Sequence, residues 1–126
     1  MSLPLPKEEL PEKIRRFGDP AAPTPARTMA AKGLVPVKGT DLVTLLVQLS
    51  ADSDEGVRSA ADGTLRGLPD EVLRPAVTAP LHPEILDGLL RYVQKEQSLL
   101  EELAANRATP HATVAKIAKQ CDVHTA

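Results

Sequence analysis

Two strongly periodic apolar segments, joined by a short acidic turn, occupy the stretch DLVTLLVQLSADSDEGVRSAADGTLRGLP from Asp41 to Pro69. The first segment carries leucine or valine at so many positions that its apolar stripe is too wide for one neighbour, which predicts a helix buried between two layers. The second segment, about Asp54 to Leu68, is apolar on one side only. Aspartates in the turn suit the N-terminus of the second helix because they complement its dipole. The stretch therefore predicts a helical hairpin.

The same helical spacing recurs in the later part of the chain. Apolar residues follow helical periodicity after Pro69, after Pro83, from about Ser98 and again after Thr109. Pro75 predicts that the helix after Pro69 is brief and partly irregular. No stretch shows the alternation of apolar and polar residues that a sheet requires. The sequence therefore predicts an all-α fold.

The N-terminus is rich in proline, with six of the twelve prolines in the first 25 residues. We expect residues 1–23 to form an arm with at most one short helix, about Lys7 to Phe17, and residues 24–126 to form the helical domain. Thr24 followed by Pro25 predicts a helix start with threonine as the cap, and Gly33 predicts the end of that helix.

Charge and composition restrict the possible partners. The chain of 126 residues has a formal charge of −2, and the residues from 41 to 103 carry twelve acidic and five basic side chains, a net −7. An acidic middle argues against a surface that follows nucleic-acid phosphates. One Phe, one Tyr and no Trp leave little for stacking on bases.

The helical segments repeat with a period of 28 residues. With that shift, HPEILDGLL overlays PHATVAKIA, and Pro83 falls on His111, Leu86 on Val114, Leu89 on Ile117 and Leu90 on Ala118. We expect Val114, Ile117, Ala118 and Cys121 to form the apolar face of the last helix. Similarity at a fixed period is typical of solenoids, in which each unit covers its neighbour. Chance similarity between amphipathic helices is the alternative.

Residues 42–68, as LVTLLVQL followed by SADSDEGVRSAADGTLRGL, resemble a HEAT-type repeat, and LAANRATPHATVAKIA is similar to the leucine-rich-variant type of bacterial helical repeat. The resemblance covers roughly residues 40–120 and implies a short right-handed α-solenoid of about six to seven helices. Asp52 and Arg58 match the family positions that form a polar ladder between successive repeats. The family's proline in the first helix has no counterpart in DLVTLLVQL.

Catalytic and metal-binding patterns are weak. CDVH, with Cys121 and His124, offers two ligands where a structural zinc site needs four, and the remaining histidines are His82 and His111. Adjacent acids such as Glu101 and Glu102 are typical of exposed helix positions. We therefore expect no enzyme activity, no cofactor and no metal. One cysteine excludes an intrachain disulfide, no apolar run is long enough for a membrane span, and no secretory signal is present, so we expect a cytoplasmic protein.

The resemblance to helical repeats implies a protein–protein interaction scaffold that binds through the second helices of successive units. The candidate partner-binding residues lie on the helices 54–68 and 83–93: Glu55, Asp62, Arg66, Asp87 and Arg91. The acidic middle favours a partner with a basic surface. The last helix lacks the polar capping repeat that usually ends a solenoid. Either the chain associates with itself through this helix, or the repeats continue in a longer protein, which is the interpretation that we favour.

A nucleic-acid-binding helical repeat is the alternative function. It would use the basic residues of the N-terminal 40 positions: Arg15, Arg16, Arg27, Lys32 and Lys38. Arg15, Arg16 and Phe17 also permit contact with an acidic or membrane surface, although a solvated helix end explains them more simply.

Overall fold

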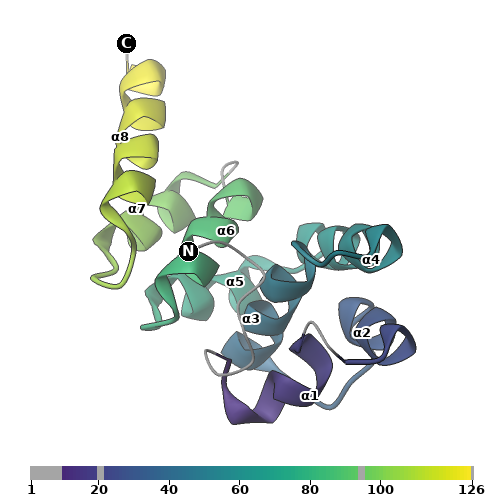
Figure 1. The fold of residues 1–126 in the computed structure, drawn as a ribbon. Coiled ribbons are helices and arrows are strands. Elements are labelled where there is room, and N and C mark those ends of the chain that lie inside the picture. The colour runs from purple at the N-terminus through teal and green to yellow at the C-terminus, as the bar shows by residue number, and fades with distance from the viewer. Residues whose placement is uncertain (1–9, 20–21, 94–95, 126) are drawn as a thin grey trace.

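The computed structural model describes residues 10–19, 22–93 and 96–125, and the side chains as far as residue 118. The all-α prediction is confirmed: the described residues form eight α-helices and one short 3₁₀ helix, with no strand. The elements are η2 (Glu12–Ile14), α1 (Arg15–Gly18), α2 (Thr24–Ala31), α3 (Gly39–Leu49), α4 (Glu55–Arg66), α5 (Asp70–Thr78), α6 (Pro83–Val93), α7 (Gln97–Ala105) and α8 (His111–Thr125). They follow one another from α1 and α2 at one end of the molecule to α7 and α8 at the other (Figure 1).

Helix α3 is the centre of the packing. Every residue from Val43 to Leu49 is buried, because α1, α2, α4, α5 and α6 all contact this helix. The predicted burial between two layers is confirmed. The two polar side chains inside this run have hydrogen-bond partners: the Thr44 hydroxyl donates to the Thr40 carbonyl in the same helix, and the Gln48 amide donates to the Gly18 carbonyl of α1. Burial of the run therefore leaves no polar cost that opposes it.

The odd-numbered helices α3, α5 and α7 contact one another in sequence, whereas α6 and α8 mainly contact odd-numbered helices. Helix α3 packs on α5 and α5 packs on α7; α2 packs on α4, while α6 and α8 lie against α7. Arg74 of α5 reaches Glu102 of α7, and Asn106 at the end of α7 reaches the Val77 carbonyl near the end of α5. These two contacts show that α5 and α7 run in the same direction.

Long-range polar contacts join elements that are two apart in the chain. Most of the described side-chain hydrogen bonds and ion pairs that span 24 to 33 positions follow this pattern, whereas the pair between Arg27 and Asp52 joins α2 to the turn before α4. The helix-to-helix contacts are Gln48 to Gly18 (α3 to α1), Thr64 to Ala31 (α4 to α2), Tyr92 to Asp62 (α6 to α4), Arg74 to Ser98 and Glu102 (α5 to α7), Asn106 to Val77 and Ala79 (α7 to α5), and Thr113 and Lys116 to Asp87 (α8 to α6).

The 28-residue shift coincides with the starts of three helices. Helices α4, α6 and α8 begin at Glu55, Pro83 and His111, each 28 positions after the one before. Each buries its third and seventh residues, which are Val57 and Ala61 in α4, Ile85 and Leu89 in α6, and Thr113 and Ile117 in α8. The common inward face is therefore set by these two positions.

The face predicted for α8 is rotated relative to the observed one. Ile117 is buried as expected, but Val114 is half-buried and Ala118 is exposed, while Thr113 is fully buried. Leu86 and Leu90 of α6, which the shift aligns with Val114 and Ala118, are both buried. The difference arises because α6 contacts α3, α5 and α7, whereas α8 packs mainly on α7. The side chain of Cys121 lies outside the described part.

The N-terminal segment packs on the helical domain. Leu10 and Ile14 are buried, Phe17 is half-buried, and η2 and α1 contact α3. The expected single helix from about Lys7 to Phe17 is wrong for the described residues, because Leu10 and Pro11 are not helical and the segment after them forms η2 and then α1. The domain boundary after residue 23 stays a prediction, and residues 1–9 lie outside the described part.

Helix α2 ends as predicted but begins differently. Gly33 has a φ of 76°, its N–H donates to the Ala30 carbonyl, and the Leu34 N–H donates to the Met29 carbonyl. This is a Schellman motif, in which Met29 and Leu34 occupy the usual apolar pair of positions, and both are exposed. The prediction for Thr24 is wrong. Thr24 is the first helical residue, the cap position belongs to Pro23, and the Thr24 hydroxyl accepts from Arg27.

Gly63, which is exposed within α4, and Gly18, which is buried at the end of α1, should respond oppositely to alanine. A Cβ at Gly63 of α4 meets no atom within 4 Å, whereas a Cβ at Gly18 would lie 3.1 Å from Leu45 Cδ1. We expect Gly63→Ala to raise the free energy of unfolding by about 0.5–1 kcal/mol through helix propensity. Gly18→Ala should lower it, because the neighbouring side chains must move. Urea unfolding followed by circular dichroism measures both, and a destabilised Gly63→Ala would contradict this account of α4.

Candidate functional site

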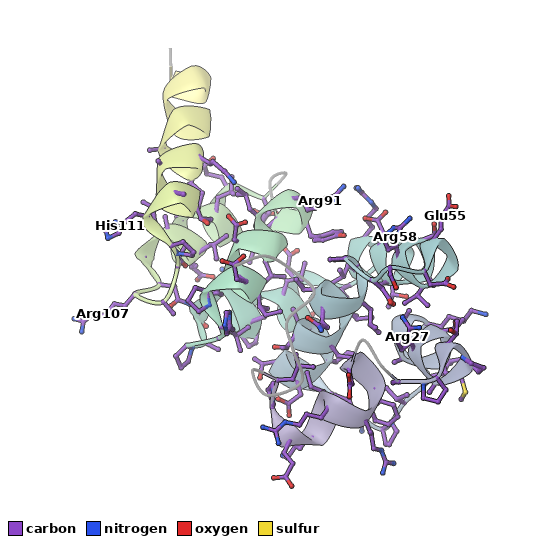
Figure 2. The ribbon with its side chains drawn as sticks, in the orientation of Figure 1. Arg27, Glu55, Arg58, Arg91, Arg107 and His111 are labelled. Atoms are coloured by element: carbon purple, nitrogen blue, oxygen red, sulfur yellow. The ribbon has the colours of Figure 1, made fainter. Side chains whose placement is uncertain are left out.

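Three of the five candidate binding residues come together between α4 and α6. Asp62 and Arg66 lie one turn apart on α4, and Arg91 lies near the end of α6, next to Tyr92. These four residues are called the α4–α6 cluster below. Figure 2 shows Arg91 on the side of α6 that faces α4, whereas Glu55 lies at the far end of α4.

The other two candidates are placed differently. Glu55 is exposed in the first turn of α4, away from the cluster. Asp87 of α6 accepts a hydrogen bond from the Thr113 hydroxyl and lies 3.6 Å from Lys116 Nζ, so it joins α6 to α8. Its carboxylate is therefore engaged within the fold, in contrast to the freely exposed position expected from the sequence.

The α4–α6 cluster is organised around the carboxylate of Asp62. Arg66 Nε donates to Oδ2 at 2.9 Å, and the Tyr92 hydroxyl donates to Oδ1 at 2.8 Å. The guanidinium carbons of Arg66 and Arg91 lie 5.7 and 5.6 Å from the centroid of the Tyr92 ring. Both distances are within the range of cation–π attraction. One aromatic ring thus holds two guanidinium groups beside one carboxylate.

The contacts shift the pKa of both acids in the cluster. The hydrogen bond from Arg66 holds the pKa of Asp62 below its usual value, and Tyr92 adds to this effect. Burial raises the pKa of Tyr92 above 10, and its hydrogen bond to the Asp62 carboxylate raises it further. Because the folded-state pKa of Tyr92 is raised, its contribution to stability is fully present below pH 10 and is lost as the pH rises through the folded pKa.

Tyr92 is the single tyrosine of a chain without tryptophan, so its titration can be followed by absorbance of the phenolate. We expect the native protein to titrate at a higher pH than the chain in denaturant, because burial and Asp62 disfavour the phenolate. Asp62→Asn should lower the native midpoint part of the way, since burial remains. Circular dichroism at the same pH values controls for unfolding. Equal midpoints in the native and denatured chains would contradict the described contact.

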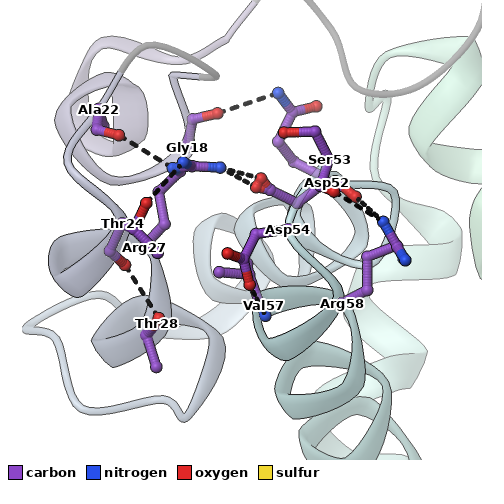
Figure 3. A network of polar contacts seen from close by, with 11 residues as sticks. Gly18, Ala22, Thr24, Arg27, Thr28, Asp52, Ser53, Asp54, Val57 and Arg58 are labelled. Atoms are coloured by element: carbon purple, nitrogen blue, oxygen red, sulfur yellow. Dashed lines mark hydrogen bonds and ion pairs between the residues drawn. The ribbon is translucent and has the colours of Figure 1, made fainter.

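A second polar network lies at the other end of α4, around Asp52 (Figure 3). Arg27 of α2 and Asp52 form a buried ion pair, with side-chain exposures of 9% and 5%. Arg27 Nε also donates to the Ala22 carbonyl at 2.9 Å. Arg58 Nη1 donates to the carbonyls of Asp52 and Ser53 at 2.8 and 3.0 Å. Asp54, as expected for a cap, accepts from the Val57 N–H at 3.1 Å.

The partner of Asp52 was missed by sequence reasoning. Arg27 and Arg58 are each the fourth residue of their helix, 31 positions apart, so they are equivalent by register. Arg27 reaches forward to the turn before α4, which carries Asp52. Arg58 has no such aspartate ahead, because the segment APLH between α5 and α6 contains no acid, and it bonds to the backbone of the turn before its own helix. Aligning the starts of α2 and α4, in place of their apolar residues, shows that Arg27 is equivalent to Arg58 and so points to Arg27 as a partner for Asp52.

Arg27 and Arg58 should differ in their effect on stability. Arg27→Ala leaves the Asp52 charge buried without its partner, so we expect the free energy of unfolding to fall by about 3 kcal/mol or more. Arg58→Ala removes exposed hydrogen bonds to two carbonyls and should cost about 1–2 kcal/mol. Urea unfolding measures both. The double variant Arg27→Ala/Asp52→Ala should recover part of the loss, and equal losses for Arg27→Ala and Arg58→Ala would refute this difference.

The basic residues of the alternative function do not form one exposed group. Arg27 is buried against Asp52, Arg15 Nε donates to the Leu10 carbonyl, and the Arg16 guanidinium lies 5.1 Å from the Phe17 ring centroid. Lys32 and Lys38 are exposed. A pocket of about 400 Å³ lies beside α1 and is lined by Glu12, Lys13, Arg16, Phe17, Pro36, Val37 and Asp41. Its two acids offset its two basic residues.

The histidines have structural or surface positions where they are described. Glu84 N–H donates to His82 Nδ1 at 3.1 Å, so His82 binds an open N–H at the start of α6. His111 is exposed at the start of α8. No three His, Cys, Asp or Glu side chains converge as metal ligands in the described part of the chain, and the side chains of Cys121 and His124 lie outside it. None of the described helices combines the length and apolar character that a membrane crossing needs.

Comparison of the chain with known proteins does not assign it to a family. No protein-family model matches the chain, and no significant match is found among curated proteins or solved structures.

Proposed function

We propose that this chain is a non-catalytic scaffold for protein–protein interaction, built from stacked, HEAT-like helical hairpins. The observation that carries the proposal is that most of the described side-chain contacts that span 24 to 33 positions join elements two apart, among both the odd-numbered and the even-numbered helices. Contacts of this kind are expected where each hairpin packs on the next. Helix starts at 28-residue intervals in α4, α6 and α8 give it independent support.

The stacked arrangement also supports a docking role. In such an array each unit uses its apolar side for its neighbours, and the polar sides of successive second helices form one extended surface. Here that surface is the outer side of α4 and α6, where Glu55, Arg66 and Arg91 are exposed. The net charge of −7 between residues 41 and 103 favours a partner whose surface is basic overall.

Affinity capture tests the proposal against nucleic-acid binding. The immobilised chain is exposed to cell extract with and without nuclease, at low and moderate salt. A scaffold should still retain a protein when nuclease has removed nucleic acid that could bridge the two. Retention should weaken as salt screens the acidic surface. Purified chain should give no shift of random DNA or RNA in a gel at the same salt. Tight nucleic-acid binding that falls steeply with salt would replace this proposal with the alternative.

A further inference from the structure

The two arginines of the α4–α6 cluster share one carboxylate. Both oxygens of Asp62 already accept hydrogen bonds, one from Arg66 and one from Tyr92. Among the described residues, no carboxylate forms an ion pair with Arg91. Asp62 stays ionised near neutral pH, because its pKa is lowered. The cluster therefore carries one positive charge in excess, although it lies in the acidic part of the chain.

The geometry of the cluster suits recognition of an anionic group. The ring of Tyr92 restrains the guanidiniums of Arg66 and Arg91, so a ligand would not bear the full entropic cost of ordering two long side chains. Arg66 donates to Asp62 through Nε, and its terminal nitrogens form no hydrogen bond with the described residues. Arginine and tyrosine are also the residue types that contribute most often to binding energy at protein interfaces.

The surrounding charge indicates which kind of anion fits. A nucleic-acid strand brings a row of phosphates, and the seven excess negative charges of residues 41–103 oppose it. A single carboxylate on an otherwise basic protein surface avoids that repulsion, and it fixes the register of the partner on the helices.

We propose that Arg66 and Arg91, held on Tyr92, bind an Asp or Glu side chain of the protein partner, which is basic around that residue. The inference rests on the proposed scaffold function and names the specificity of its docking surface. Arg91 is the main donor, since Arg66 is already paired with Asp62.

Selection from a displayed library of random peptides tests the inference with the full chain. Wild type should enrich peptides that carry one acidic residue among basic ones. A synthetic peptide of this kind should bind about tenfold more weakly to Arg66→Gln/Arg91→Gln and retain its affinity for Arg107→Gln, an exposed arginine on the turn before α8 (Figure 2). Circular dichroism checks that the variants fold.

A double-mutant cycle locates the contact. Changing the acidic residue of the peptide to its amide should weaken binding to wild type about tenfold and have little further effect on Arg66→Gln/Arg91→Gln. Additive effects, or enriched peptides without an acidic residue, would overturn the inference while leaving the scaffold in place. Enrichment of no peptide, or binding of a random oligonucleotide that needs Arg66 and Arg91, would also overturn it. Capture of a protein from extract tests the scaffold separately.

Discussion

Burial of α3 from Val43 to Leu49 is the constraint on which the rest of the structure depends. Seven consecutive residues of this helix are inaccessible to water, and five other helices cover them. Each fully buried leucine or valine contributes roughly 1.5–3 kcal/mol relative to an exposed one. A helix that is apolar on nearly all sides cannot stand at the edge of a fold, so α1, α2, α4, α5 and α6 are arranged around it. The later helices then extend the array through α5 and α7.

Polar contacts affect the relative positions of the helices more than the stability of the fold. A hydrogen bond contributes about 1 kcal/mol net, far less than the burial around α3. The described bonds nevertheless join particular pairs of elements, such as Thr64 with the Ala31 carbonyl and Asn106 with the Val77 carbonyl. Apolar faces permit some sliding of one helix along another, whereas a buried donor is satisfied in one register only. These polar contacts therefore favour one register of α4 on α2 and of α7 on α5.

The α4–α6 cluster combines a structural contact with the charges of the proposed binding site. The Tyr92 hydroxyl joins α6 to α4 through Asp62, while the ring of the same residue holds two guanidiniums at the surface. The proposed binding site draws on two helices, α4 and α6, and is therefore sensitive to their relative position. The same contact that sets the packing of α6 on α4 thus sets the spacing of the charges that a partner would meet.

The sequence by itself determined the helices and most of the buried faces, because helical periodicity is a local property that survives any arrangement of neighbours. Val57, Ala61, Ile85, Leu89 and Leu103 are buried as their spacing predicts. Sequence also placed Asp62, Arg66 and Arg91 on the same pair of helices. Only the tertiary structure decided that Tyr92 contacts Asp62 and that Asp87 contacts α8. It also decided that Asp52 pairs with Arg27, and that α8 buries Thr113 in place of Ala118. These outcomes depend on contacts between residues about 25 to 30 positions apart, which local periodicity does not encode.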